Sequence, residues 1–218
     1  MSRVLPILFN GDMVRAILDG RKTVTRRCVK FLNGKNPNWT GYVKDGLMLY
    51  NGTNEPCIKL CQYHPGDIMY VRETWCKGKI DFGEEPDGRE VLYVSQCQAE
   101  EDYIHKEYVL RNGIGIDDVI WKPSIHMPKE AARIWLKVKD VRVERLQEIT
   151  EDGIRREGVA VDSKDCAGKF DYVSELFFLF QKLWNSTIKK SDLDLYGWDA
   201  SPWVWVIEFE RCENPEGW

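Results

Sequence analysis

Histidine is scarce in this sequence, and long apolar runs are missing. Its 218 residues include three histidines, too few to favour a catalytic triad or a metal site built on histidine. No apolar run approaches the roughly 20 residues that a membrane-spanning helix requires, and the apolar stretch near the N-terminus is too short for a signal peptide. We therefore expect a cytoplasmic protein without a membrane partner.

The cysteines lack the spacing of a disulfide framework. Seven cysteines, an odd number, are scattered along the chain, and such a set indicates reduced thiols. Cys57, Cys61 and His64 form a C-x3-C-x2-H pattern, but no second pair of ligands follows at a distance typical of zinc sites. We expect buried or idle thiols, no metal and no cofactor.

A large excess of charge of one sign is also absent. The net charge of −4 argues against a protein that coats nucleic acid nonspecifically, and 43% hydrophobic with 30% charged residues is an ordinary globular balance. The charge is uneven, however. Between Gly20 and Lys44 there is no acidic residue and there are seven basic ones: Arg21, Lys22, Arg26, Arg27, Lys30, Lys35 and Lys44. Such a segment can hold a phosphate or form a solvated basic loop, and charge alone leaves both open.

The N-terminal pattern predicts a strand, a helix and then the basic segment. Residues 4–9 are an apolar strand candidate, and Asn10 begins a turn with helix-capping chemistry. Val14 and Ile17 fall on one face of the helix that follows. Gly20 stands where a glycine would end that helix. The basic segment is therefore expected to emerge from a helix C-terminus.

Later segments predict further strands and two helices. Strands are expected over 68–75, 91–97 and 203–209, and a hairpin within 42–50. The apolar alternation over 134–143 shifts phase at Lys139 and Asp140, as in a bulged or bent strand. Thr150 is the expected cap of a short helix that Gly158 ends, and a stripe at three-and-four spacing predicts a helix over 173–184. We predict one α+β domain, residues 1–218, whose curved strands suit a small barrel.

The segment Gly20-Arg21-Lys22-Thr23-Val24-Thr25-Arg26-Arg27 resembles the G-x-K-x-x-(E/T)-x-R signature that opens ASCH domains. Five further segments, in order, look like a phage and prophage group of ASCH proteins: 7–10 with 13–20, 65–67, 71–75, 121–128 and 203–209. The resemblance covers nearly the whole chain. It implies a PUA-like small mixed β-barrel with flanking helices. The stretches 31–65 and 76–128 are then insertions, which can cap a pocket and alter the substrate.

One branch of the ASCH family is a small bacterial amidohydrolase that removes the acetyl group from N4-acetylcytidine. In that branch a Lys and a Thr of the G-x-K-T-x-T turn and a Glu on a later short helix are implicated in catalysis. The resemblance places these roles on Lys22, Thr25 and Glu157. Many ASCH proteins carry Glu at the position of Thr25, so the threonine favours the hydrolase branch.

This trio has a coherent chemistry. A lysine acts as a base only when its pKa falls well below about 10.4, through desolvation and nearby cations such as the arginines of the turn. Neutral Lys22 would then take a proton from Thr25 or from water, while Glu157 holds Lys22 or relays the proton. The alternative is that Thr25 is a turn hydroxyl and Lys22 a phosphate contact.

Other side chains are candidates for contacting the substrate. Glu73 and Trp75 combine a carboxylate with an indole, which suits recognition of an exocyclic amine and a stacked base. Equally, Trp75 can fill the core while Glu73 pairs with a buried arginine, and His126 can line a pocket or be an ordinary loop histidine. The full set of expected substrate-binding residues is Thr23, Arg26, Arg27, Arg72, Glu73, Trp75 and His126.

Two hypotheses for the function follow. The first is an amidohydrolase that acts on an N-acylated nucleobase or nucleoside through Lys22, Thr25 and Glu157. The second is a PUA-like module that binds RNA or a modified base without catalysis. A buried Lys22 near Thr25 and Glu157 favours the first, and an exposed Lys22 on an open basic surface favours the second. The expected partner is a nucleoside or RNA, and the sequence gives no expectation of the oligomeric state.

Overall fold

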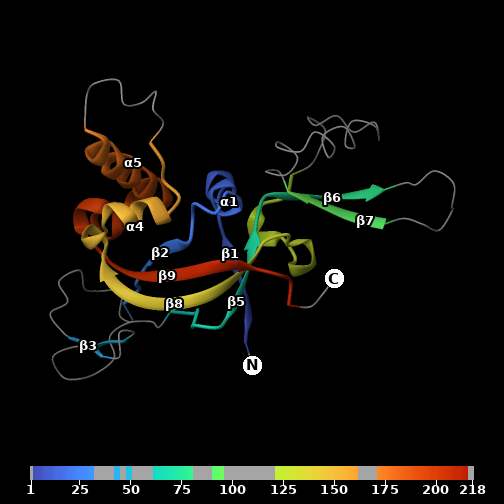
Figure 1. Cartoon of the computed structure of the whole chain (residues 1–218), viewed down its shortest axis with the longest axis horizontal. Helices are drawn as coiled ribbons and strands as arrows, with labels where there is room; N and C mark the ends of the chain where they lie inside the picture. Colours follow the sequence, from blue (N-terminus) through green and yellow to red (C-terminus); the bar gives the residue numbers. More distant parts are fainter. Residues whose placement is uncertain are drawn as a thin grey trace. The chain divides into compact units, whose positions relative to one another are not determined.

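The computed structural model describes residues 2–31, 42–44, 48–50, 61–80, 90–95, 121–161 and 171–215, with the side chains of 42–44, 48–50, 77–80 and 90–95 excepted. The chain is a mixed α/β protein (Figure 1). Five strands are hydrogen-bonded in the order β1-β5-β8-β9-β2, and β3-β4 and β6-β7 form two-stranded sheets. The strands are β1 (Val4–Leu8), β2 (Val24–Cys28), β3 (Tyr42–Lys44), β4 (Met48–Tyr50), β5 (Ile68–Arg72), β6 (Trp75–Ile80), β7 (Glu90–Ser95), β8 (Trp135–Arg145) and β9 (Trp203–Cys212).

The α-helices are fewer than the strands in the described part of the chain. The α-helices are α1 (Gly11–Leu18), α4 (Glu151–Arg156), α5 (Tyr172–Thr187) and α6 (Leu193–Tyr196). Short 3-10 helices are η2 (Ser124–His126), η3 (Lys129–Ala131), η4 (Leu146–Glu148), η5 (Lys190–Asp192) and η6 (Trp198–Ala200). Within the described residues, no helix has the length and apolar character needed to cross a membrane.

The chain forms two compact units. The first unit comprises Met1–Leu18, Ile68–Leu136 and Arg211–Trp218, and the second comprises Asp19–Asp67 and Lys137–Glu210. The single domain expected from the sequence stays a prediction.

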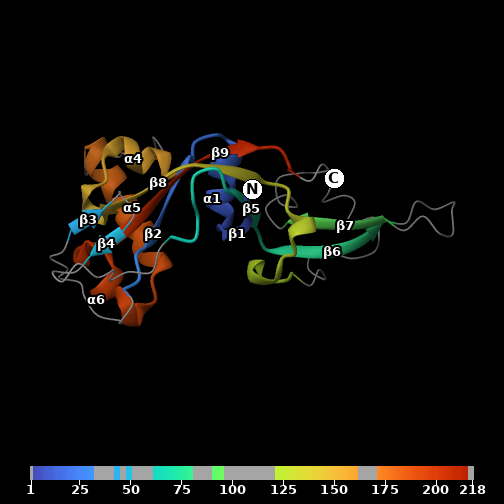
Figure 2. The same ribbon diagram turned by 90° about the horizontal axis from the view of Figure 1, so that it is seen from below.

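In the first unit, β1 and β5 pair in parallel, with Val4 opposite Ile68. The expected helix is present as α1, where Asn10 Oδ1 accepts from the Met13 amide at 2.9 Å and Val14 and Ile17 are buried. The strand expected over 68–75 is wrong as a single element, because β5 ends at Arg72 and a second strand, β6, begins at Trp75. β6 pairs antiparallel with β7, which covers most of the strand expected over 91–97 (Figure 2).

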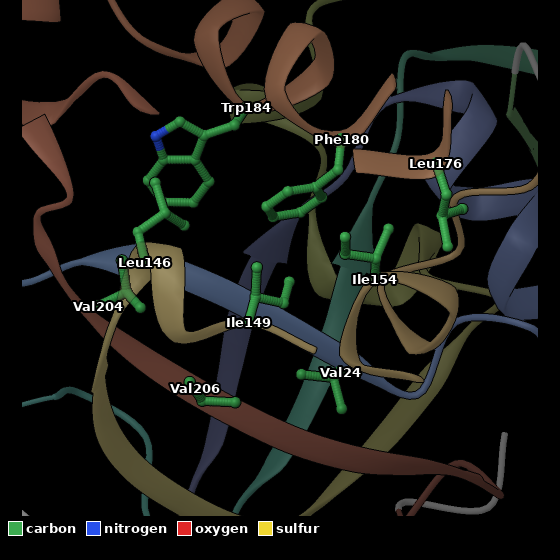
Figure 3. Close-up of a cluster of buried hydrophobic side chains, with 9 residues drawn as sticks. All are labelled: Val24, Leu146, Ile149, Ile154, Leu176, Phe180, Trp184, Val204 and Val206. Atoms are coloured by element: carbon green, nitrogen blue, oxygen red, sulfur yellow. The ribbon is translucent and has the colours of Figure 1, made fainter. Parts of the chain in front are cut away.

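In the second unit, β2 pairs antiparallel with β9, and one face of this pair packs on α4 and α5. Along α5 the stripe Leu176, Phe180 and Trp184 is buried, which confirms the helix predicted from the three-and-four spacing. Figure 3 shows these three side chains directed toward residues of α4, η4 and the strands. The cluster consists of Val24, Leu146, Ile149, Ile154, Leu176, Phe180, Trp184, Val204 and Val206.

Two finer expectations about the strands are confirmed. In β8, Lys139 and Asp140 are both exposed between buried Val138 and Val141, so the phase of the alternation shifts where expected. β3 and β4 pair antiparallel with Tyr42 opposite Tyr50, as expected for a hairpin within 42–50. Most of the two expected insertions, 32–41, 45–47 and 51–60 in the first and 81–89 and 96–120 in the second, lies outside the described residues.

Candidate functional site

The basic segment that begins at Gly20 and the helix α4 have the glycines and the cap that the sequence predicts. Gly20 and Gly158 have positive φ angles of 74° and 90°, the left-handed conformation of glycines that follow a helix. Thr150 caps α4 by accepting from the Gly153 amide at 3.1 Å. Lys22, just before β2, bridges to Glu157, the residue that follows α4. This bridge fixes the basic segment against the C-terminus of α4.

Lys22 and Glu157 form a buried ion pair across 135 positions of sequence. Lys22 Nζ donates to Glu157 Oε2 at 2.6 Å, to the Glu157 carbonyl at 2.8 Å and to the Val24 carbonyl at 2.8 Å. The side chains of Lys22 and Glu157 are 1% and 8% exposed. All three ammonium protons therefore have acceptors, and the structure brings together two of the three residues expected to be catalytic.

Arg26 occupies the second oxygen of the same carboxylate. Its Nη1 donates to Glu157 Oε1 at 3.1 Å, and its Nη2 to Glu144 Oε2 at 3.4 Å. Arg26 is buried, so its guanidinium contacts protein carboxylates here. A Cβ at Gly153 would lie 3.3 Å from Arg26 Nη2, a contact tight enough that glycine eases the approach of α4 to this arginine. Glu157 is thus held by one cation on each oxygen.

The charges continue in an alternating network. Glu144 also accepts from Arg142 Nε at 2.5 Å. Arg142 in turn donates to Glu208, which accepts from Arg156 Nη2 at 2.9 Å, and Arg156 Nε donates to Thr23 Oγ1 at 3.2 Å. The network contains Lys22, Glu157, Arg26, Glu144, Arg142, Glu208, Arg156 and Thr23. Thr23, expected to contact substrate, here binds a protein arginine.

Burial lowers the pKa of Lys22 from its ordinary value of 10.5; the charge and hydrogen bond of Glu157 oppose this shift, and the charges of Arg27 and Arg26 add to it. The cations of the turn therefore act on Lys22 as the sequence predicts. A buried lysine whose pKa is lowered has a larger neutral fraction, and only the neutral amine can accept a proton.

Thr25 is buried on β2, opposite Ile207 of β9. Because side chains alternate along a strand, Thr25 lies on the opposite face of β2 from Val24 and Arg26. Arg27 shares the face of Thr25 and is exposed. Thr25, the third expected catalytic residue, therefore points to one face of the sheet, whereas Arg26 contacts Glu157 on the other face.

The other expected substrate-binding residues lie in the first unit. Both oxygens of Glu73 accept from Arg133, at 3.0 and 2.9 Å, as the arginine-pairing alternative predicts. Trp75 is buried with Met127 and Ala131. Arg72 Nη1 donates to the Ile125 carbonyl at 3.0 Å and its Nη2 to Tyr70 Oη at 3.0 Å. His126 is exposed in η2.

Sequence reasoning missed the acidic members of the network, Glu144 and Glu208, and the arginines Arg142 and Arg156. For three of them a signal was present, because Arg142, Glu144 and Glu208 alternate with apolar residues along β8 and β9, whereas Arg156 lies in α4. These residues are recognisable as partners only once the strand pairing is known, since alternation gives a face and not a neighbour.

The described residues also include part of the C-x3-C-x2-H pattern. Cys57 lies outside the described residues, whereas Cys61 and His64 are described. His64 Nδ1 is 3.7 Å from Asp67 Oδ2. Over the ranges that the structure describes, no three or more His, Cys, Asp and Glu side chains gather as metal ligands would.

Comparisons with known proteins leave the family open. No protein-family model matches the chain, and neither a curated protein nor a solved structure matches it significantly.

Proposed function

We propose that this chain is an ASCH-type protein with a PUA-like small barrel, and that it hydrolyses the amide of an N-acylated nucleobase or nucleoside. Lys22 and Glu157 are its central pair, and Thr25, three residues after Lys22, lies on the other face of β2. The observation that carries the proposal is the burial of Lys22 Nζ 2.6 Å from Glu157 Oε2. A buried, lowered-pKa amine held by a carboxylate is the arrangement that an acyl-transfer base needs.

In the proposed reaction, Lys22 transfers one proton from the attacking nucleophile to the leaving amine. Neutral Lys22 takes a proton from water as the water oxygen attacks the acyl carbon. The resulting ammonium, paired with Glu157, gives the proton to the departing amine of the base. The products are a carboxylic acid and the free amino base. The charge of Arg27, which helps to lower the pKa of Lys22, also favours the developing oxyanion.

The test is turnover of a panel of N-acylated cytidines and adenosines, followed by chromatography of the released nucleoside. Lys22→Arg keeps a buried cation but cannot act as a base, because a guanidinium stays protonated. We expect this variant to lose about 10²- to 10⁴-fold in kcat, the usual contribution of a general base. Circular dichroism checks that it is folded.

The matched control is Lys139→Arg. Lys139 forms an ion pair with Glu210 at 3.2 Å in which both side chains are about half exposed, 54% and 51%. We expect its turnover to equal that of the wild type. No turnover of any substrate by the wild type, or equal turnover in Lys22→Arg and the wild type, would sink the enzyme hypothesis.

The alternative function is binding of RNA or a modified base without catalysis. It is favoured by Arg27 and Lys30, whose side chains are exposed within the basic segment. RNA affinity should then fall steeply with salt and with loss of Arg27. An affinity indifferent to both would exclude this alternative.

A further inference from the structure

A pocket of about 310 Å³ lies in the second unit, and three of its lining residues, Arg27, Trp205 and Ile207, lie on the face of the β2-β9 pair opposite to the one that packs on α4 and α5. Its volume falls at the lower end of the range of small-molecule sites. The residues that line it are Arg27, Cys28, Lys30, Cys61, Gln62, Tyr63, Trp205 and Ile207. Ile207 is the register partner of Thr25, so one wall of the pocket is the face of β2 that carries Thr25.

The charge of the pocket is positive. Arg27 and Lys30 are both exposed at its lining, and none of the described residues that line it is a carboxylate. Burial raises the pKa of the Cys28 thiol to about 11 and also raises the pKa of Tyr63, so neither adds a negative charge at neutral pH. The occupant that this lining favours is an anion.

Four basic residues between Gly20 and Lys44 divide into two groups. Lys22 and Arg26 are buried on the carboxylates of Glu157 and Glu144. Arg27 and Lys30 instead reach the pocket, and the charge of Arg27 is one of the causes that lower the pKa of Lys22. The pocket therefore lies within electrostatic reach of the Lys22–Glu157 pair.

The rest of the lining suits a planar ring. Trp205 and Tyr63 provide aromatic surface, Ile207 an apolar one, and Gln62 an amide that can both donate and accept. A planar heterocycle bound beside aromatic residues, with an anionic group on two cations, matches a nucleotide more closely than a free nucleoside.

We propose that this pocket binds a nucleoside monophosphate, with the phosphate on Arg27 and Lys30 and the base beside Trp205 and Tyr63. The inference rests on the proposed function in making the substrate an N-acylated nucleotide. A pocket of this volume holds one nucleotide and not a run of several.

The test is calorimetric titration with cytidine monophosphate and with cytidine at low salt. We expect the monophosphate to bind at least about tenfold more tightly, because a hydrogen bond to a charged group contributes about 1.5–3 kcal/mol and 1.4 kcal/mol is tenfold. The double variant Arg27→Gln/Lys30→Gln should lose this preference. Both side chains are exposed, so the fold should persist, and thermal unfolding checks this.

The control variant is Lys182→Gln, an exposed lysine on α5, the helix that packs on the other face of the strand pair. It should keep the preference for the monophosphate. Equal affinities for the two ligands in the wild type, or an unchanged preference in the double variant, would overturn the proposal. Tetracytidylate binding more than about tenfold tighter than the monophosphate would also overturn it, in favour of RNA.

The titrations use unacylated ligands and need no turnover. A retained preference for the monophosphate, together with failure of the acyl panel, would remove the proposed hydrolysis and leave the pocket assignment standing. Hydrolysis of acylated cytidine without a preference for the monophosphate would support the proposed hydrolysis and remove the pocket assignment.

Discussion

Glu157 is the residue on which the buried charges of the second unit converge. One of its carboxylate oxygens accepts from Lys22 and the other from Arg26. Its loss would leave two cations in a poorly solvated site with only Glu144, whose side chain is 25% exposed, to offset them. Removing one partner of a buried pair is costly because the remaining charge stays desolvated.

Stability should therefore respond unequally to the two halves of the pair. We expect Glu157→Gln to lower the free energy of unfolding by roughly 3–5 kcal/mol, the range for breaking a buried ion pair. Lys22→Met should cost less, since Glu157 keeps its bond to Arg26. Urea denaturation of both variants measures the difference.

The reference for this comparison is Glu210→Gln, which breaks the half-exposed pair with Lys139. Its effect should stay within about 0.5 kcal/mol, as for other surface changes. A loss in Lys22→Met as large as that in Glu157→Gln would contradict the account of Glu157 as the shared centre.

At the scale of elements, α4 sets the position of this carboxylate. Its six residues are too few to be stable in isolation, so capping and packing must hold it. Thr150 caps its first turn, and Ile154 on its inner face is fully buried. Glu157 follows directly, so the carboxylate is placed by a helix that is itself held at both its start and its core face.

Removal of the Thr150 cap should destabilise α4, the helix that positions Glu157. Thr150→Ala is expected to lower the free energy of unfolding by about 0.5–2 kcal/mol, with no loss of buried surface because Thr150 is exposed. Thr150→Ser, which keeps a hydroxyl, should restore most of it. Equal stability of the alanine and serine variants, measured by urea denaturation, would show that the cap contributes nothing.

Local patterns predicted the elements best where the partner was near in sequence. The cap of α4, its glycine and the stripe of α5 depend on residues within one or two turns. The break between β5 and β6 was missed because its cause is distant. Trp75 exchanges backbone hydrogen bonds with Lys122, at 3.1 and 2.8 Å, and no local alternation reveals a partner so far along the chain.

At the scale of the whole molecule, the lowered pKa of Lys22 has a consequence for stability against pH. Between the pKa of Lys22 in the folded protein and 10.5, the unfolded chain binds more protons at this position than the folded chain does. Stability then rises with pH in that window. The penalty of burying the ammonium is present below the folded pKa and is relieved as pH rises through it.

The measurement is the free energy of unfolding of the wild type and of Lys22→Met from pH 7 to 10.5. The difference, wild type minus variant, should grow in favour of the wild type as pH rises. Other titrating groups are common to both proteins and cancel in the difference. A difference that stays flat or falls over this range would contradict the shift.

The candidate site could be predicted only in part, because some of its contacts depend on long-range pairing across the whole molecule. Lys22 and Glu157 were matched through a family resemblance, and they do form a contact. The sequence does not predict that Arg26 binds Glu157 and Glu144. Charge alone cannot distinguish an arginine that binds a ligand's phosphate from one that binds a carboxylate of the protein. That distinction needs burial and the β2-β9 register, which come from long-range pairing.

The separation of Lys22 from Glu157 also determines when the basic segment can be neutralised during synthesis. A growing chain presents Lys22 and Arg26 early, but their shared carboxylate is added 135 and 131 positions later. β9, which pairs with β2, is made later still. Such distant contacts are slow to form, so Lys22 and Arg26 cannot meet their shared carboxylate until at least 131 further residues have been added to the growing chain.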